Sequence, residues 1–172
     1  MDFGPIPKGR LWKMFHEKRW TYVAVADEKM FAAMAVVSLN YVATAMVFVL
    51  DRATGTLLVD RSILGPGTAA SFEDAGDGKR KALFQWGRTE LSLSDEGCVV
   101  DLAGESTPIH IVMRPLAGTA AQPIAAVVPI EGGYANATEK RLLEAEVEIV
   151  ADGQRFLLDR AIAAFDHTAG FL

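Results

Sequence analysis

Residues 144–158 read EAEVEIVADGQRFLL, and this stretch carries the clearest structural pattern in the sequence. Glutamate alternates with an apolar residue from Glu144 to Val150, so an extended chain presents its acidic residues on one face and its apolar residues on the other. Asp152-Gly153 then supplies a tight turn into a second strand at residues 155–158. The pattern predicts an antiparallel hairpin with one wet face and one buried face.

Short β-rich runs, each closed by turn residues, continue along most of the chain. We therefore predict an all-β, antiparallel, lipocalin-like barrel or strongly curved sandwich of roughly ten strands, without a long helix. The expected strands are residues 20–26, 30–39, 41–50, 56–63, 82–94, 98–103, 109–116, 124–130, 144–150 and 155–158. Residues 65–67 are expected to end the fourth strand and residues 70–79 to form a loop. The pattern at residues 11–19 fits a short helix or a strand entry.

Residues 30–50 carry no charged side chain. A helix of this length can span a bilayer, so hydropathy alone leaves a transmembrane helix as an alternative. Two buried strands are favoured because valine is abundant and because the run divides at Asn40-Tyr41, where a polar amide would be costly in lipid. The flanks at residues 27–29 and 51–55 are typical of hairpin turns. We predict two strands and no stable membrane insertion.

Composition limits the classes of protein to consider. At 172 residues, 51% of them hydrophobic, the chain can bury a substantial core without disulfides or a metal. We divide it into an irregular lead-in at residues 1–18, a lipocalin-like β-domain at 19–160, and the start of a linker or second half at 161–172. The net charge of −5 argues against nucleic-acid binding, which needs a basic patch. A single cysteine, Cys98, and the lack of an apolar signal segment predict a cytoplasmic protein.

The sequence contains no recognisable metal, nucleotide or hydrolase motif. The histidines His16, His110 and His167 are isolated, and neither Cys-x-x-Cys nor His-x-x-x-His spacing occurs. No Gly-x-Ser-x-Gly elbow is present. The glycines at residues 65–67 and 76–78 do not open a helix after a strand, as a phosphate-binding loop requires. We expect neither a metal nor a cofactor.

Candidate site residues come from two patterns. His110 and Arg114 share one face of the predicted strand at 109–116, where they would offer a proton donor and a cation to a cavity. The alternative is that the apolar residues between them form the core, so that both polar side chains face water. Tyr41 and Trp86 are candidates for lining a ligand pocket because amphipathic rings suit such sites, with core packing as the alternative. Asp166 is a further candidate for assisting His110.

Several short motifs resemble a known family. They are Lys18-Arg19-Trp20-Thr21-Tyr22, Asn40-Tyr41, Phe48-Val49-Leu50-Asp51 and the closing stretch Phe165-Asp166-His167-Thr168-Ala169-Gly170. Together they resemble the bacterial and fungal family catalogued as domain of unknown function 2804, over nearly the whole chain. This family is distantly similar to the carotenoid hydratase and tocopherol cyclase group, whose members pair two lipocalin-like β-domains. The resemblance implies that this chain corresponds to an N-terminal half.

These observations lead to two functional expectations from different classes. The first is a domain that binds a small apolar or lipid-like molecule, forming half of a cofactor-independent isomerase, hydratase or cyclase in which His110, with Arg114 or Asp166, supplies protons. The alternative is a structural or protein-interaction β-module without a small-molecule ligand. In that case a second β-domain or a second copy would cover the apolar strands at residues 30–50.

Overall fold

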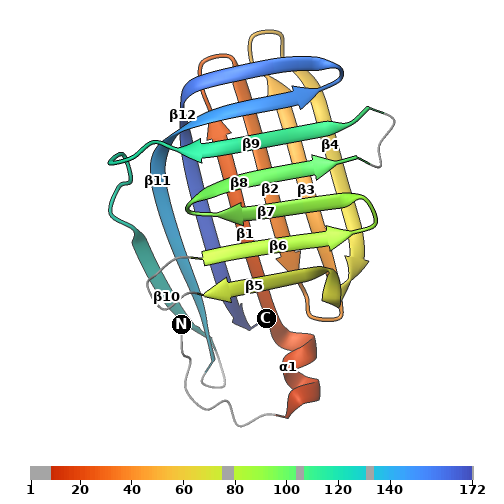
Figure 1. Ribbon diagram of the computed structural model, residues 1–172. Coiled ribbons are helices and arrows are strands. Elements are labelled where there is room, and N and C mark those ends of the chain that lie inside the picture. The colour runs from red at the N-terminus through yellow and green to blue at the C-terminus, as the bar shows by residue number, and fades with distance from the viewer. Residues whose placement is uncertain (1–8, 75–79, 104–106, 131–133, 172) are drawn as a thin grey trace.

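The computed structural model describes residues 9–74, 80–103, 107–130 and 134–171, and they form one twelve-stranded antiparallel sheet preceded by a short helix (Figure 1). The sheet order is β4-β3-β2-β1-β12-β11-β9-β8-β7-β6-β5, and β10 pairs with β11 outside this path. The elements are α1 (Arg10–His16), β1 (Glu17–Ala26), β2 (Met30–Ser38), β3 (Val42–Asp51), β4 (Thr56–Pro66), the 3-10 turn η1 (Gly67–Ala69), β5 (Ala70–Asp74), β6 (Arg80–Trp86), β7 (Thr89–Ser94), β8 (Gly97–Leu102), β9 (Ile109–Pro115), β10 (Ile124–Ile130), β11 (Tyr134–Ala151) and β12 (Gln154–Phe171).

The sheet curls strongly, so that its first and last strands meet at η1, which connects β4 directly to β5. In Figure 1, β5 to β9 cross in front of β1 to β4 at a steep angle, and the long strands β11 and β12 form the side of the fold. β2 packs face to face against β5, β6 and β7. The prediction of an all-β, antiparallel, strongly curved fold is confirmed.

The core lies between the two crossing halves of the sheet, where inward-facing apolar residues alternate with outward-facing ones. The predicted alternation at residues 144–150 is confirmed, because Ala145, Val147 and Ile149 are buried in this core. Phe84, Phe165 and Met34 fill the centre, and each is at most 1% exposed. The interior is therefore occupied by the protein's own side chains.

The charge-free run at residues 30–50 forms the adjacent strands β2 and β3, as predicted. Asn40 lies in the turn between them with a φ of 66°, and its side-chain amide donates to the Glu17 carbonyl oxygen over 2.9 Å. No helix among the described residues is long and apolar enough to cross a membrane. The hairpin turn predicted at Asp152-Gly153 is also present, with positive φ at both residues.

One predicted loop and one predicted strand were wrong. Residues 70–74 form β5 instead of a loop, because Phe72 faces inward between the exposed residues Ser71 and Glu73 and thereby continues the strand alternation. Residues 75–79 lie outside the described residues. The single strand expected at 82–94 is a hairpin, since Gly87, at a φ of 62°, turns β6 back into β7.

The C-terminal part of the chain differs from expectation, and the N-terminal part decides between two open alternatives. Of the short helix and the strand entry considered for residues 11–19, the helix is present as α1 up to His16, and β1 begins at Glu17. Residues 1–8 lie outside the described residues. Residues 161–171, expected to start a linker or second half, instead continue β12 between β1 and β11. The reason is that Ala161, Ala163 and Phe165 fill inward positions that complete the core on this side.

Candidate functional site

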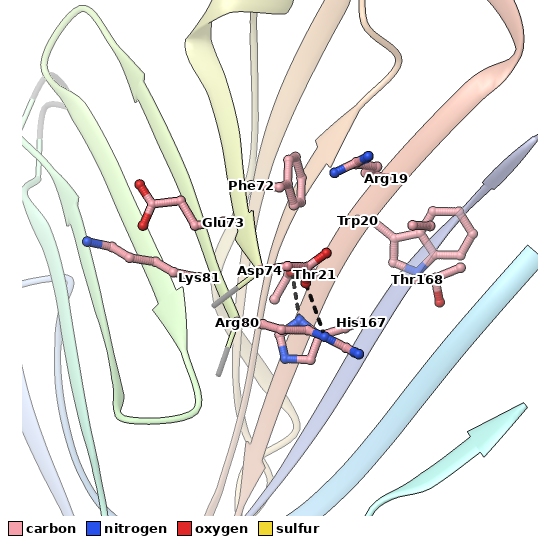
Figure 2. A pocket seen from close by; sticks show the side chains of 11 residues that line it. Arg19, Trp20, Thr21, Phe72, Glu73, Asp74, Arg80, Lys81, His167 and Thr168 are labelled. Carbon is pink, nitrogen blue, oxygen red and sulfur yellow. Dashed lines mark hydrogen bonds and ion pairs between the residues drawn. The ribbon is translucent and has the colours of Figure 1, made fainter. Parts of the chain in front are cut away.

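The inward face of the sheet changes from apolar to polar at the end that lies near α1 in Figure 1. Toward this end, Thr21 is the next inward residue beyond the buried Val25 and Val23 on β1, and His167 is the next inward residue beyond the buried Phe165 on β12. The register of the two strands makes Thr21 and His167 direct cross-strand partners. Figure 2 shows these two side chains facing Arg80 of β6 and Asp74 of β5 across a small pocket.

His167 is held at both ring nitrogens. Its Nδ1 lies 3.0 Å from the Thr21 hydroxyl, and its Nε2 lies 3.2 Å from Oδ1 of Asp95 in the turn between β7 and β8. Thr21 and His167 are 2% and 6% exposed, and the Asp95 side chain is 8% exposed. Because a carboxylate only accepts hydrogen bonds, Nε2 is the donor to Asp95. In the neutral tautomer that carries its proton on Nε2, Nδ1 accepts from the Thr21 hydroxyl.

A chain of alternating charges continues from Asp95 across the polar end. Its contacts are Asp95 Oδ2 to Arg141 over 3.4 Å, Arg141 to Glu139 over 3.4 Å, Glu139 to Arg80 over 2.9 Å, and Arg80 to Asp74 over 3.3 Å. Within the described part of the chain, Asp95 Oδ2 and Arg141 Nε are buried without a hydrogen bond. We call Thr21, His167, Asp95, Arg141, Glu139, Arg80 and Asp74 the polar cluster. The adjoining cavity, of about 40 Å³, has room for about three water molecules.

A second depression lies on the outer face of the sheet. Strand register sets Tyr22, Asp166, Lys140 and Ile124 side by side in one row across β1, β12, β11 and β10. The small side chain of Ala164 lies within this area, so the larger neighbours enclose a groove of about 330 Å³. The segment at residues 116–123 forms one wall, held to β11 by a backbone hydrogen bond of 2.8 Å from Ala121 to Leu142.

The polar side of this groove centres on Asp166. Its Oδ1 accepts hydrogen bonds of 2.9 Å from Thr138 and from Thr168, and its Oδ2 accepts from the Lys140 ammonium. Partial burial raises the pKa of Asp166, but the hydrogen bonds from Lys140, Thr168 and Thr138 outweigh it, so the pKa is lowered from 3.8. Asp166 is thus a satisfied carboxylate, whereas Lys140, 61% exposed at its side chain, retains two N–H donors beyond its bond to Asp166.

The structure separates the candidate residues that were chosen from the sequence. Asp166 lies in the outer groove. His110 and Arg114 share the outward face of β9, and the residues between them, Ile111 and Met113, are buried in the core. Arg155, by a hydrogen bond, lowers the pKa of Glu148 on this outward face, with smaller effects from Arg114 and His110.

The two aromatic candidates lie elsewhere on the surface. Tyr41 follows the β2 strand in its turn to β3 and is 52% exposed, with its ring 5.7 Å from that of Phe15. Trp86 ends β6 and is 50% exposed. These two residues and the His110–Arg114 pair therefore occupy different elements and do not converge on one cavity.

Sequence reasoning did not select Thr21, Asp95 or Lys140, and it left His167 as an isolated histidine. One usable signal was present: Thr21 occupies the same face of its strand as Val23 and Val25, so it is a polar residue at a buried position. Asp95 carried no such signal, since a turn aspartate before glycine is ordinary. Within the described residues, no group of three or more His, Cys, Asp or Glu side chains is placed to hold a metal ion.

Comparison with known proteins gives a family but no relative of known activity. No curated protein and no solved structure matches the chain. The distant similarity to the carotenoid hydratase and tocopherol cyclase group stays a prediction. The sequence profile described as "Domain of unknown function (DUF2804)" matches residues 7–172, so the chain belongs to the domain of unknown function 2804 family.

Proposed function

We propose that this domain binds a small amphiphilic molecule in the outer groove, with an apolar body and an acceptor oxygen at its polar end. The observation that carries the proposal is the groove itself. Its volume of about 330 Å³ falls in the range of small-molecule sites, and its walls are mainly apolar, with few polar groups. Tyr22, Leu142 and Ile124 supply the apolar surface, and Lys140 supplies the donor.

The filled interior is the reason to place the ligand outside the curved sheet. An apolar molecule between the two halves of the sheet would have to displace Phe84, Phe165 or Met34, each of which is fully packed. In the groove, by contrast, Leu142 and Ile124 are 52% and 73% exposed. Covering these side chains removes apolar surface from water, which is the main driving force for such binding.

Lys140 determines the polar end of the ligand. Asp166 takes one hydrogen bond from the Lys140 ammonium, and a carboxylate, hydroxyl or carbonyl oxygen of the ligand can accept another. Asp166 already accepts three hydrogen bonds, so it does not favour a ligand with additional donors. A fatty acid or a terpenoid alcohol of moderate length has this chemistry.

A fluorescent undecanoic acid carrying a dansyl group tests the proposal. We expect saturable binding with blue-shifted emission, a Kd at least tenfold higher in Leu142→Asp, and a smaller increase in Lys140→Met, which keeps the apolar stem. Leu157→Asp is the matched control, because Leu157 is 62% exposed but lies outside the groove. Equal Kd values for Leu142→Asp and Leu157→Asp would refute the groove as the site.

One observation favours the alternative of an interaction module. All seven residues of β10, IAAVVPI, are apolar, six of them exposed, and among the described residues β10 pairs with β11 alone. An uncharged edge strand can pair antiparallel with the same strand of a second copy about a twofold axis, since no like charges meet. We propose this homodimer as the second candidate function. Sedimentation velocity should show a concentration-dependent dimer that Val127→Lys abolishes, and a monomer at all concentrations would exclude it.

A further inference from the structure

We propose that Thr21, His167 and Asp95 form a hydroxyl–imidazole–carboxylate site that hydrolyses esters of a short acyl group, about the size of acetyl. This inference rests on the polar cluster and is independent of the outer groove, because His167 and Asp166 point to opposite faces of β12. A sequence search for a hydrolase elbow misses this arrangement, since Thr21 lies within a strand and not on a sharp turn.

The geometry has the three roles that nucleophilic catalysis needs. Thr21 offers a hydroxyl 3.0 Å from His167, and Asp95 orients the imidazole from the other side over 3.2 Å. Relative to the well-known serine triads, the two ring nitrogens are exchanged, with Nδ1 facing the hydroxyl and Nε2 facing the carboxylate. The partners and not the atom names determine the roles, so Nδ1 is the base.

The surroundings of Thr21 and His167 indicate a pocket that is open to solvent rather than a closely packed group of polar side chains. Thr21 and His167 both line the cavity, and Glu73 and Lys81 at its rim are exposed to solvent (Figure 2). Behind His167, Asp95 Oδ2 has the 3.4 Å ion pair to Arg141 but no hydrogen bond among the described residues, so the polar cluster is not fully hydrogen-bonded within itself. Arg80 also lines the cavity, where Glu139 and Asp74 balance its charge and hold its guanidinium in place.

The size of the cavity determines the class of substrate. At about 10–15 Å³ for each water-sized group, a cavity of about 40 Å³ admits about three such groups. An acetyl group has three heavy atoms and fits this space, whereas a long acyl chain would collide with Phe72, which lines the same cavity. The alcohol part of the ester would extend past the rim toward solvent.

The reaction balances without a cofactor. The Thr21 oxygen attacks the ester carbonyl carbon while its proton moves to His167 Nδ1, and the Nε2–H bond to Asp95 stabilises the imidazolium. The carbon–oxygen bond to the alcohol breaks, and the alcohol leaves with the proton from Nδ1. Water then attacks the acyl-threonine, His167 takes and returns a proton in the same way, and the carboxylic acid leaves with Thr21 restored.

Incubation with p-nitrophenyl acetate, followed by an acid quench and peptide mass spectrometry, tests the proposal. We expect an acetyl group on Thr21 in the wild-type protein, and p-nitrophenol release at least 100-fold slower in His167→Gln. p-Nitrophenyl octanoate should react far more slowly than the acetate, because its chain exceeds the cavity.

Thr21→Val keeps the size of the side chain and removes its hydroxyl, and Thr44→Val is the matched control on the outward face of β3. We expect the first variant to lose acetylation and hydrolysis and the second to retain both. The proposal is overturned if wild-type protein carries no acetyl group on Thr21, or if Thr21→Val hydrolyses the acetate as fast as Thr44→Val. The labelling of wild-type protein gives this answer even where a variant folds poorly.

Discussion

Asp95→Asn is the most informative perturbation of the polar cluster, because it keeps the shape of the side chain and removes only its charge. Asp95 contacts His167 through Oδ1 and Arg141 through Oδ2. The amide oxygen of asparagine can still accept a hydrogen bond from His167 Nε2. The substitution removes the negative charge that His167 and Arg141 both contact.

The expected cost follows from the two contacts. A hydrogen bond to a charged acceptor stabilises a protein by about 1 kcal/mol more than a neutral one, so the His167 contact loses about that amount. The ion pair to Arg141 spans 3.4 Å and joins side chains that are 24% and 8% exposed, so solvent screening limits its loss to about 1 kcal/mol. We expect a total destabilisation of about 2 kcal/mol, which lowers the Tm of a chain of this length by about 4–8 °C.

Thermal unfolding followed by circular dichroism at neutral pH measures this difference. Asp101→Asn is the control, because Asp101 is an exposed aspartate on the neighbouring strand β8. A Tm for Asp95→Asn within about 1 °C of the Asp101→Asn value would refute the reasoning, since the buried contacts would then contribute no net stability.

Three further predictions concern other parts of the fold. Gly67→Ala should lower the free energy of unfolding by about 1–3 kcal/mol in urea, because an added Cβ would lie 1.7 Å from the Asn40 carbonyl oxygen; an unchanged urea midpoint would contradict this packing. Cys98 should not react with an aromatic disulfide reagent at about pH 8 until the protein unfolds, since burial raises the pKa of its thiol to about 12, and rapid labelling of native protein would contradict its burial. Asp166 should stabilise the fold above pH 3.8 and lose this effect as the pH falls through its lowered pKa. The difference in free energy of unfolding between wild type and Asp166→Asn should therefore close on acidification, and a difference independent of pH would disprove the shift.

Much of the fold follows from local patterns in the sequence. The alternation at residues 144–150 and the turn at Asp152-Gly153 predict the β11–β12 hairpin, because burial of one face imposes a period of two on a strand. The extension of both strands to 18 residues was not predicted. Their outer ends carry polar inward residues such as His167, which a pattern of apolar alternation does not recognise as strand.

The candidate sites were less predictable than the fold because they depend on long-range register. Thr21 and His167 lie 146 residues apart in the chain, and Asp95 and His167 lie 72 apart. Each pair meets only after the sheet has curled, so no local motif records it. The outer groove depends on register in the same way, since Tyr22, Asp166 and Lys140 come from three different strands.

The contrast between the two ends of the interior argues that the polar cluster is a functional feature. An apolar cluster of similar volume would satisfy the same inward positions at little or no cost in stability, because buried ion pairs lose most of their Coulombic gain to desolvation. The apolar residues next to Thr21 and His167 on the inward faces of β1 and β12, Val23 and Phe165, show that the same strands accommodate such packing. The polar cluster places a buried hydroxyl, an imidazole and a carboxylate in contact beside a small cavity, at inward positions where aliphatic side chains would pack as well. At this end the sheet therefore departs from the apolar pattern of its own core. Such departures from local consistency are where functional sites are expected.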